Sequence, residues 1–203
     1  MHPESLAGHH DRLEKVVDVI RTYHDEAVFA NEIDVFAMIR QYLDMAKDAD
    51  ASLPPDMPGM IEIGAQIEAA MRRNQPRPTA CHNDLLSENF ILDESGRMWV
   101  IDWEYGGMAD PYFDLGDFCV EHPLSADEER FIATRYEGEF QEHRYSRMLL
   151  HKLVADLLWS IWAMIQAKVS TIDFDFHRYG MARVARFHEN AGKPEYPTWI
   201  ATV

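Results

Sequence analysis

Two stretches in the middle of the chain concentrate polar side chains: Cys81-His82-Asn83-Asp84-Leu85-Leu86-Ser87-Glu88-Asn89-Phe90 and Ile101-Asp102-Trp103-Glu104-Tyr105. Packing does not require such residues, although Asn and Asp are also common in turns. Phosphoryl transfer from ATP needs a carboxylate near the substrate hydroxyl and hard oxygen ligands for magnesium, usually one carboxylate and one amide. Asp84, Asn89 and Asp102 supply that set if a loop and a hairpin bring them together.

The sequence around these stretches predicts a small β-insert. Residues 79–82, 90–92 and 98–101 are short and strand-like. Between the last two lies Glu94-Ser95-Gly96-Arg97, a turn signal with a glycine. We therefore expect a β-hairpin that follows a loop and returns Asp102 to the neighbourhood of Asp84 and Asn89.

The rest of the chain is predicted to be helical. Apolar residues at helical spacing indicate helices over 13–24, 36–46 and 60–71, with Asn31 or Asp34 as caps of the second. Ser125-Ala126-Asp127-Glu128 fits a capping box, and a helix through Gln141 is expected after it. Ser146 is expected to cap a long helix, and Asp173 a last one that ends near Asn190.

Composition places the chain among globular proteins and narrows its partners. Of 203 residues, 47% are hydrophobic and 27% charged, which excludes disordered and collagenous chains. The formal net charge of −16 argues against an open nucleic-acid-binding surface, which needs a basic face. The only two cysteines are too few for a disulfide framework or a Cys-based zinc site.

Signals for membranes and secretion are not found in the sequence. No run reaches the roughly 20 uninterrupted apolar residues that span a bilayer. The start of the chain, Met1-His2-Pro3-Glu4, has neither the basic nor the apolar region of a signal peptide. We expect a cytoplasmic protein without membrane insertion.

The two polar stretches resemble the catalytic loop and the metal-binding segment of small-molecule kinases with a protein-kinase-like fold. Asn83 after the histidine and the run Asp102-Trp103-Glu104-Tyr105 are closer to choline/ethanolamine kinases than to aminoglycoside phosphotransferases. Further stretches resemble helices of the same kinases: Phe113-Asp114-Leu115-Gly116-Asp117-Phe118 with Glu121, Leu158-Trp159-Ser160-Ile161-Trp162, and Ile172-Asp173-Phe174 with Tyr179. The resemblance covers about residues 17–190.

The resemblance implies a role for each residue of the motifs. Asp84 would accept or orient the proton of the substrate hydroxyl, and Asn89 and Asp102 would hold the magnesium ions that bridge the phosphates of ATP. His82 would be a scaffold residue. Asp114 would be buried and hydrogen-bonded to the catalytic loop, in a structural role.

Glu121, Trp159, Trp162 and Tyr179 would form the pocket for the ammonium group of a small amino alcohol, choline or ethanolamine. A quaternary ammonium donates no N–H hydrogen bond, so aromatic faces and a carboxylate hold it, at about 0.5–2 kcal/mol per cation–π contact. Aromatic residues at helical spacing are also ordinary core residues, and Glu121 fits a plain helix end.

The resemblance covers one of the two lobes of such a kinase. Before Thr79 there is no glycine-rich loop, and the lysines, Lys15 and Lys47, lie in helical stretches. The expected fold class is therefore α+β, mainly α: a protein-kinase-like C-terminal lobe whose central β-hairpin carries the catalytic and metal-binding loops, with the N-terminal β-lobe absent. We expect one domain over 1–203, with a helical segment at 1–78, the catalytic loop and hairpin at 79–104, and a helical substrate-pocket segment at 105–203.

A chain of this kind is expected to bind ATP weakly and to turn over slowly by itself. Its exposed inter-lobe face is expected to favour self-association. Two other functions fit the same residues: a kinase of another hydroxylated small molecule, such as an aminoglycoside or amino sugar, and a catalytically silent amine-binding module. An intact set of Asp84, Asn89 and Asp102 favours an enzyme over the silent module.

Overall fold

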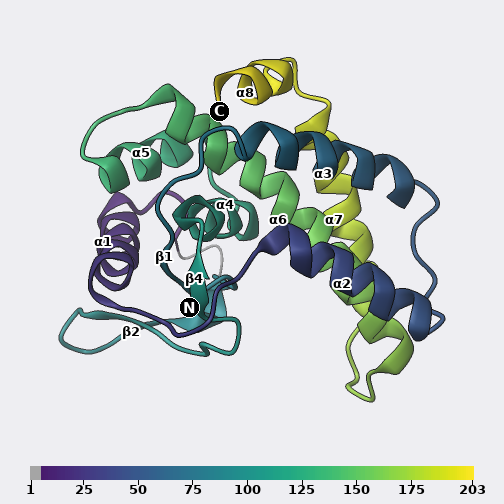
Figure 1. Cartoon of the computed structure of the whole chain (residues 1–203). Coiled ribbons are helices and arrows are strands. Elements are labelled where there is room, and N and C mark those ends of the chain that lie inside the picture. Colours follow the sequence, from purple (N-terminus) through teal and green to yellow (C-terminus); the bar gives the residue numbers. More distant parts are fainter. Residues whose placement is uncertain (1–5) are drawn as a thin grey trace. The chain divides into compact units, whose positions relative to one another are not determined.

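The computed structural model describes residues 6–203 and consists mainly of helices with two small β-sheets (Figure 1). The chain divides into two compact units, and each unit combines two separate stretches of sequence. Unit 1 contains Met1–Ile33 and Gln75–Lys152, and unit 2 contains Asp34–Asn74 and Leu153–Val203. The mainly helical fold class is confirmed, and the prediction of a single domain stays a prediction.

Unit 1 holds all the strands that the structure describes. Its elements are α1 (His10–Glu26), β1 (Thr79–Cys81), the 3-10 turn η2 (Ser87–Asn89), β2 (Phe90–Leu92), β3 (Met98–Val100), β4 (Gly107–Ala109), α4 (Pro111–Glu121), α5 (Ala126–Glu137) and the first part of α6 (Glu142–Val169). Helix α1 packs against α5 and β1, and α4 also packs against β1 and α5. His82 and Asn83, which follow β1, are buried in this unit.

The predicted β-hairpin is present as β2 and β3. The strands are antiparallel, with Phe90 opposite Val100 and Ile91 opposite Trp99. Gly96 has a φ of 81°, a left-handed conformation that a glycine adopts without strain, and it closes the turn. Side chains alternate between two faces. Phe90 is fully buried, whereas Ile91 is 45% exposed on the outer face. Self-association through the exposed inter-lobe face stays a prediction.

A second strand pair, β1 with β4, was not predicted. Cys81 pairs with Gly107 in the antiparallel register. A Cβ atom at Gly107 would lie 2.4 Å from the side chain of Ile33, so only glycine fits there. The pairing brings residue 82 and the segment after Asp102 to the same end of unit 1.

Unit 2 is entirely helical in the described residues. It contains α2 (Val35–Asp48), α3 (Met57–Met71), the remainder of α6, α7 (Phe176–Ala191) and α8 (Tyr196–Thr202). Gly64 and Gly180 allow close helix packing, because a Cβ atom at Gly64 would lie 2.7 Å from Leu157 and one at Gly180 would lie 2.5 Å from Met164. Helix α8 was not predicted.

Some of the predicted helix caps are confirmed. Asp34 caps α2 by accepting hydrogen bonds from the backbone amides of Phe36 and Ala37. Ser125 and Glu128 form the predicted capping box of α5.

Three of the predicted helix ends are wrong. Helix α5 ends at Glu137 and not at Gln141, because Gly138 takes a left-handed conformation with φ 84°. Helix α6 begins at Glu142, so Ser146 is a buried residue inside it. Asp175, and not Asp173, caps α7.

Helix α6 is long and apolar enough to cross a membrane, with a mean hydropathy of 1.5 over its most apolar window. However, 94% of that window is buried inside the structure. Burial of this kind is typical of the central helix of a protein core.

Candidate active site

The loop that carries Asp84 leads from β1 to the 3-10 turn η2. Asp84 is half-buried, and Asn89 is the last residue of η2 and is 7% exposed. The Asn89 side-chain amide donates a hydrogen bond to the backbone carbonyl of Asp84 at 2.9 Å. This bond fixes the orientation of the amide and leaves its oxygen, a hard metal ligand, directed away from the Asp84 carbonyl.

The segment with Asp102 is joined to this loop by hydrogen bonds from the preceding residue. The Ile101 amide donates to the carbonyl of Asn89 at 3.0 Å, and the Ile101 carbonyl accepts from Nε2 of His82 at 2.8 Å. His82 Nδ1 in turn accepts the amide of Asp84 at 3.3 Å. The structure therefore brings the segments that carry Asp84, Asn89 and Asp102 together at one end of unit 1. Asp102 is exposed to solvent there.

Two residues of this place have a left-handed backbone. Asn83 and Asp102 both have a φ of 66°, which costs a residue with a Cβ atom about 1–3 kcal/mol. The conformation of Asn83 is held by its side-chain amide, which donates to the carbonyl of Tyr105 at 2.9 Å. Both strained residues thus lie where the loop and the Asp102 segment meet.

Asp114, in the first turn of α4, fixes the backbone of the loop that carries Asp84. Its fully buried carboxylate accepts the amides of His82 at 2.9 Å and Asn83 at 2.7 Å. It also accepts the hydroxyl of Tyr23 at 2.7 Å and Nε2 of His24 at 3.0 Å. Burial by itself would raise the pKa of Asp114, but these hydrogen bonds and the charge of His24 hold it below its ordinary value.

A second buried carboxylate holds the next part of the loop. Asp117, three residues after Asp114 on α4, accepts the amide of Leu85 at 2.7 Å. Gly116 between them lies against α6, where a Cβ atom would be 2.7 Å from the Met148 carbonyl. Sequence reasoning assigned no role to Asp117, Tyr23 or His24. The spacing of three between two aspartates on one helix was the available signal for Asp117.

His24, Cys81 and Asp114 are buried together, and their potential ligand atoms lie within 4.8 Å of one another. Both oxygens of Asp114 already accept hydrogen bonds. Burial and the charge of Asp114 raise the pKa of Cys81 well above its ordinary value, so its thiol stays protonated. This group is therefore a hydrogen-bonded core and a poor metal site.

The predicted aromatic residues lie together in unit 2. Trp159 is 5% exposed, and its ring meets that of Trp162 edge to face at 6.0 Å. Trp162 lies 6.3 Å from the ring of Tyr179. The guanidinium of Arg183 stacks over Tyr179 at 3.4 Å from the ring centre. Glu121, the remaining residue predicted for this pocket, is the last residue of α4 and belongs to unit 1.

The phosphotransferase enzyme family matches residues 8–151 of the chain. A crystal structure of a choline/ethanolamine kinase family protein from Mesorhizobium loti is 31% identical, with a TM-score of 0.92 over 100% of this chain and 70% of that one. LicA in complex with AMP has the same fold, with a TM-score of 0.78, 22% identity, and coverage of 98% of this chain and 65% of that one.

Among curated proteins, ethanolamine kinase 2 of Mus musculus is 30% identical over 174 residues, which cover 73% of this chain and 45% of that protein. The chain spans between 45% and 59% of the length of three curated relatives. The matched parts of the solved structures correspond to the kinase-like C-terminal lobe. The chain belongs to the choline/ethanolamine kinase family of phosphotransferases.

Proposed function

We propose that this chain carries the catalytic and metal-binding loops of a kinase that transfers the γ-phosphate of ATP to the hydroxyl of a small amino alcohol, choline or ethanolamine. The observation that carries the proposal is a pair of hydrogen bonds of Ile101, whose carbonyl accepts from His82 and whose amide donates to the Asn89 carbonyl. These bonds join the residue before Asp102 to the Asp84 loop, and they support a position of the Asp102 carboxylate near Asn89. Membership of a kinase family supports the reaction class, and the AMP complex of LicA supports a nucleotide ligand.

Asp84 is the proposed catalytic base. Its amide is bonded to His82 and its carbonyl to Asn89, so the backbone on both sides of its side chain is fixed. A carboxylate on a fixed backbone can orient the substrate hydroxyl and accept its proton in the transition state. The energetic advantage comes from positioning, since no reorganisation of the loop is then needed during the reaction.

Asn89 and Asp102 are the proposed magnesium ligands. Their donor set fits the ion, because one side chain offers an amide oxygen and the other a carboxylate. The bond from Asn89 to the Asp84 carbonyl supports this assignment, since it uses the amide nitrogen and spares the oxygen. When bound, magnesium would neutralise charge on the phosphates of ATP.

The aromatic residues of unit 2 are the proposed site for the ammonium group. Trp162 is half-buried, and three aromatic rings surround it: Trp159, Phe176 and Tyr179. The guanidinium of Arg183 stacks on Tyr179, so one face of this ring already contacts a cation.

Titration calorimetry of the chain tests the proposal with choline, ethanolamine and an aminoglycoside, each with and without magnesium-ATP. We expect saturable choline binding that Trp162→Ala weakens about 3–30-fold, the loss of one or two cation–π contacts. The exposed Phe174→Ala is the control, and it should change affinity less.

The other outcomes separate the alternatives. Binding of the aminoglycoside but not of choline would favour a kinase of an amino sugar. Choline binding without any effect of magnesium-ATP would favour the silent amine-binding module. If no amine binds, the amino-alcohol assignment is wrong for this chain.

A further inference from the structure

Unit 1 contains a cavity whose walls carry several charged side chains. It has a volume of about 240 Å³ and lies between α1, α4, α5 and the start of α6. Its polar lining consists of Arg21, Asp25, Tyr112, Tyr136, Glu137 and Arg144. None of these side chains has a role in the proposed reaction.

The two arginines of the cavity lack the ion pairs that Arg135 and Arg147 of unit 1 make. Among the described residues, no side-chain hydrogen bond or ion pair is found for Arg21 or Arg144, and the Arg144 guanidinium lies 5.4 Å from the ring centre of Tyr112. The Nε atom of Arg144 is buried without an acceptor. A buried donor left unsatisfied destabilises the fold, and a bound oxyanion would give it an acceptor.

The two acidic residues of the cavity are not equivalent. Glu137 accepts hydrogen bonds from the Tyr112 hydroxyl and from the Gln141 amide, so its oxygens are already engaged. Asp25 accepts no hydrogen bond from the part of the chain that the structure describes, and it is exposed. The cavity therefore offers two guanidinium groups and one open carboxylate.

The wall of this cavity is connected to the catalytic loop. Tyr136 lies within hydrogen-bonding distance of Nδ1 of His24, at 2.8 Å, and Nε2 of His24 lies 3.0 Å from Asp114. Asp114 then holds the amides of His82 and Asn83. Two hydrogen bonds thus separate Tyr136 from the carboxylate that fixes the catalytic loop.

We propose that this cavity binds a small zwitterion, with an oxyanion group held by Arg21 and Arg144 and an ammonium group facing Asp25. A phosphorylated amino alcohol is a ligand of this class. Its identity as the product of the enzyme rests on the proposed function, whereas the charge arrangement of the cavity does not. Because Tyr136, His24 and Asp114 are joined by hydrogen bonds, a ligand in the cavity would change the environment of the backbone amides of His82 and Asn83.

Calorimetric titration without magnesium tests the site, with O-phosphoethanolamine and inorganic phosphate as probes. We expect saturable binding of O-phosphoethanolamine and weaker binding of phosphate. Arg144→Met should weaken O-phosphoethanolamine binding about tenfold or more, the loss of one charge-assisted contact. Arg21→Met, at an exposed position on α1, should weaken it less.

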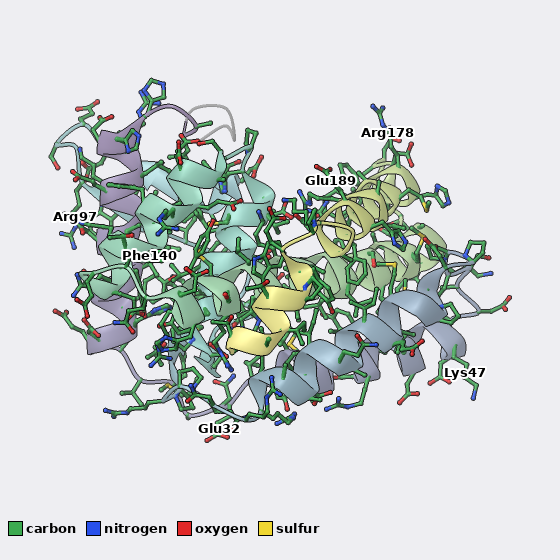
Figure 2. All side chains as sticks on the ribbon, turned by 90° about the horizontal axis from the view of Figure 1, so that it is seen from above. Glu32, Lys47, Arg97, Phe140, Arg178 and Glu189 are labelled. Carbon is green, nitrogen blue, oxygen red and sulfur yellow. The ribbon has the colours of Figure 1, made fainter. Side chains whose placement is uncertain are left out.

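Arg178→Met is the control, since Arg178 projects from the surface of α7 in unit 2 (Figure 2). It should leave binding unchanged. Absence of saturable binding, or equal affinity in the wild type and both cavity variants, would overturn the site. Equal affinities for phosphate and O-phosphoethanolamine would overturn the zwitterion assignment. Failure of choline to bind in its own titration concerns unit 2 and leaves these outcomes readable.

The connection to the loop has a separate measurement. In amide NMR spectra, O-phosphoethanolamine should shift the signals of His82 and Asn83, and Tyr136→Phe should reduce these shifts while the probe still binds. Unchanged signals at both residues in the saturated wild type would contradict the connection.

Discussion

The catalytic loop of unit 1 and the aromatic cluster of unit 2 are held in different ways. Around the loop, buried carboxylates on α4 accept backbone amides at 2.7–2.9 Å. In the aromatic cluster, rings meet edge to face and one guanidinium stacks on Tyr179. Hydrogen bonds to a buried carboxylate require a particular residue, whereas ring packing accepts several. A motif in the sequence is therefore more specific for the loop than for the cluster.

Removal of Asp114 should have the largest effect. Asp114→Ala leaves two amides, a tyrosine hydroxyl and a histidine without their acceptor in a fully buried site. We expect a loss of about 3–5 kcal/mol in the free energy of unfolding, measured with urea. The exposed Asp173→Ala is the control and should change it by less than about 0.5 kcal/mol. A small effect of Asp114→Ala would show that packing, and not hydrogen bonding, holds the loop.

The same carboxylate should make the stability depend on pH. Because the pKa of Asp114 is lower in the folded chain than in the unfolded one, its ionisation stabilises the fold above the unfolded pKa. That stabilisation is lost as the pH falls through the folded pKa. Urea unfolding at a series of acidic pH values should therefore show a shallower decline for Asp114→Asn than for the wild type. Parallel curves would mean that other carboxylates dominate acid unfolding.

Replacing the glycines at close helix contacts should have a smaller effect on the free energy of unfolding, and it can be compared in both units. Gly116→Ala should lose about 1–3 kcal/mol, because the new Cβ atom would lie 2.7 Å from a backbone carbonyl that cannot move easily. Gly180→Ala should lose less, since the nearest atom, at 2.5 Å, is the flexible end of Met164 and the next, the Cβ of Ala163, lies at 2.9 Å, whereas Gly116 faces a backbone carbonyl. Gly59→Ala is the control on α3, where no atom lies within 4 Å, and should be neutral or stabilising. Equal losses in the free energy of unfolding for Gly116→Ala and Gly180→Ala would show that the rigidity of the nearest atom does not decide the cost.

Helix caps should contribute alike in the two units. Ser125→Ala in unit 1 and Asp175→Ala in unit 2 each remove one side-chain acceptor of a backbone amide. Each should lower the free energy of unfolding by about 1 kcal/mol, measured in the same urea series. A much larger loss for one of them would indicate that its helix has a role beyond its own cap.

Local signals predicted more of the fold than distant ones. The hairpin and the capping box depend on residues within a dozen positions of each other, and both were predicted. Strand β4 pairs with β1 across more than 20 residues, and its three residues have no strand pattern of their own. The cap predicted at Asp173 was wrong because Asp175, two residues later, accepts the Arg178 amide. The cap predicted at Ser146 was wrong because α6 begins at Glu142 and Ser146 is buried inside it.

The candidate site follows the same division. Asp84, Asn89 and Asp102 were identified from chemistry and spacing along the chain. Tyr23 and His24 come from α1, and only the tertiary structure brings them to Asp114. His24 appeared in the sequence as one ring in a core stripe, which gave no sign of its hydrogen bonds. Among the residues that support the loop, the buried Asp114 was predicted because it lies in a motif, whereas Tyr23 and His24 were not. The roles of Asp84, Asn89 and Asp102 stay predictions.

The two buried cysteines provide a chemical label for one unit. Cys81 and Cys119 both lie in unit 1, at the end of β1 and within α4, and both are at most 2% exposed. Burial raises the pKa of each thiol well above its ordinary value, so neither reacts readily in the folded chain. A thiol reagent applied in short pulses therefore counts openings of unit 1 alone, because unit 2 has no sulfhydryl. Modification of Cys81 before Cys119 would indicate that β1 opens before α4.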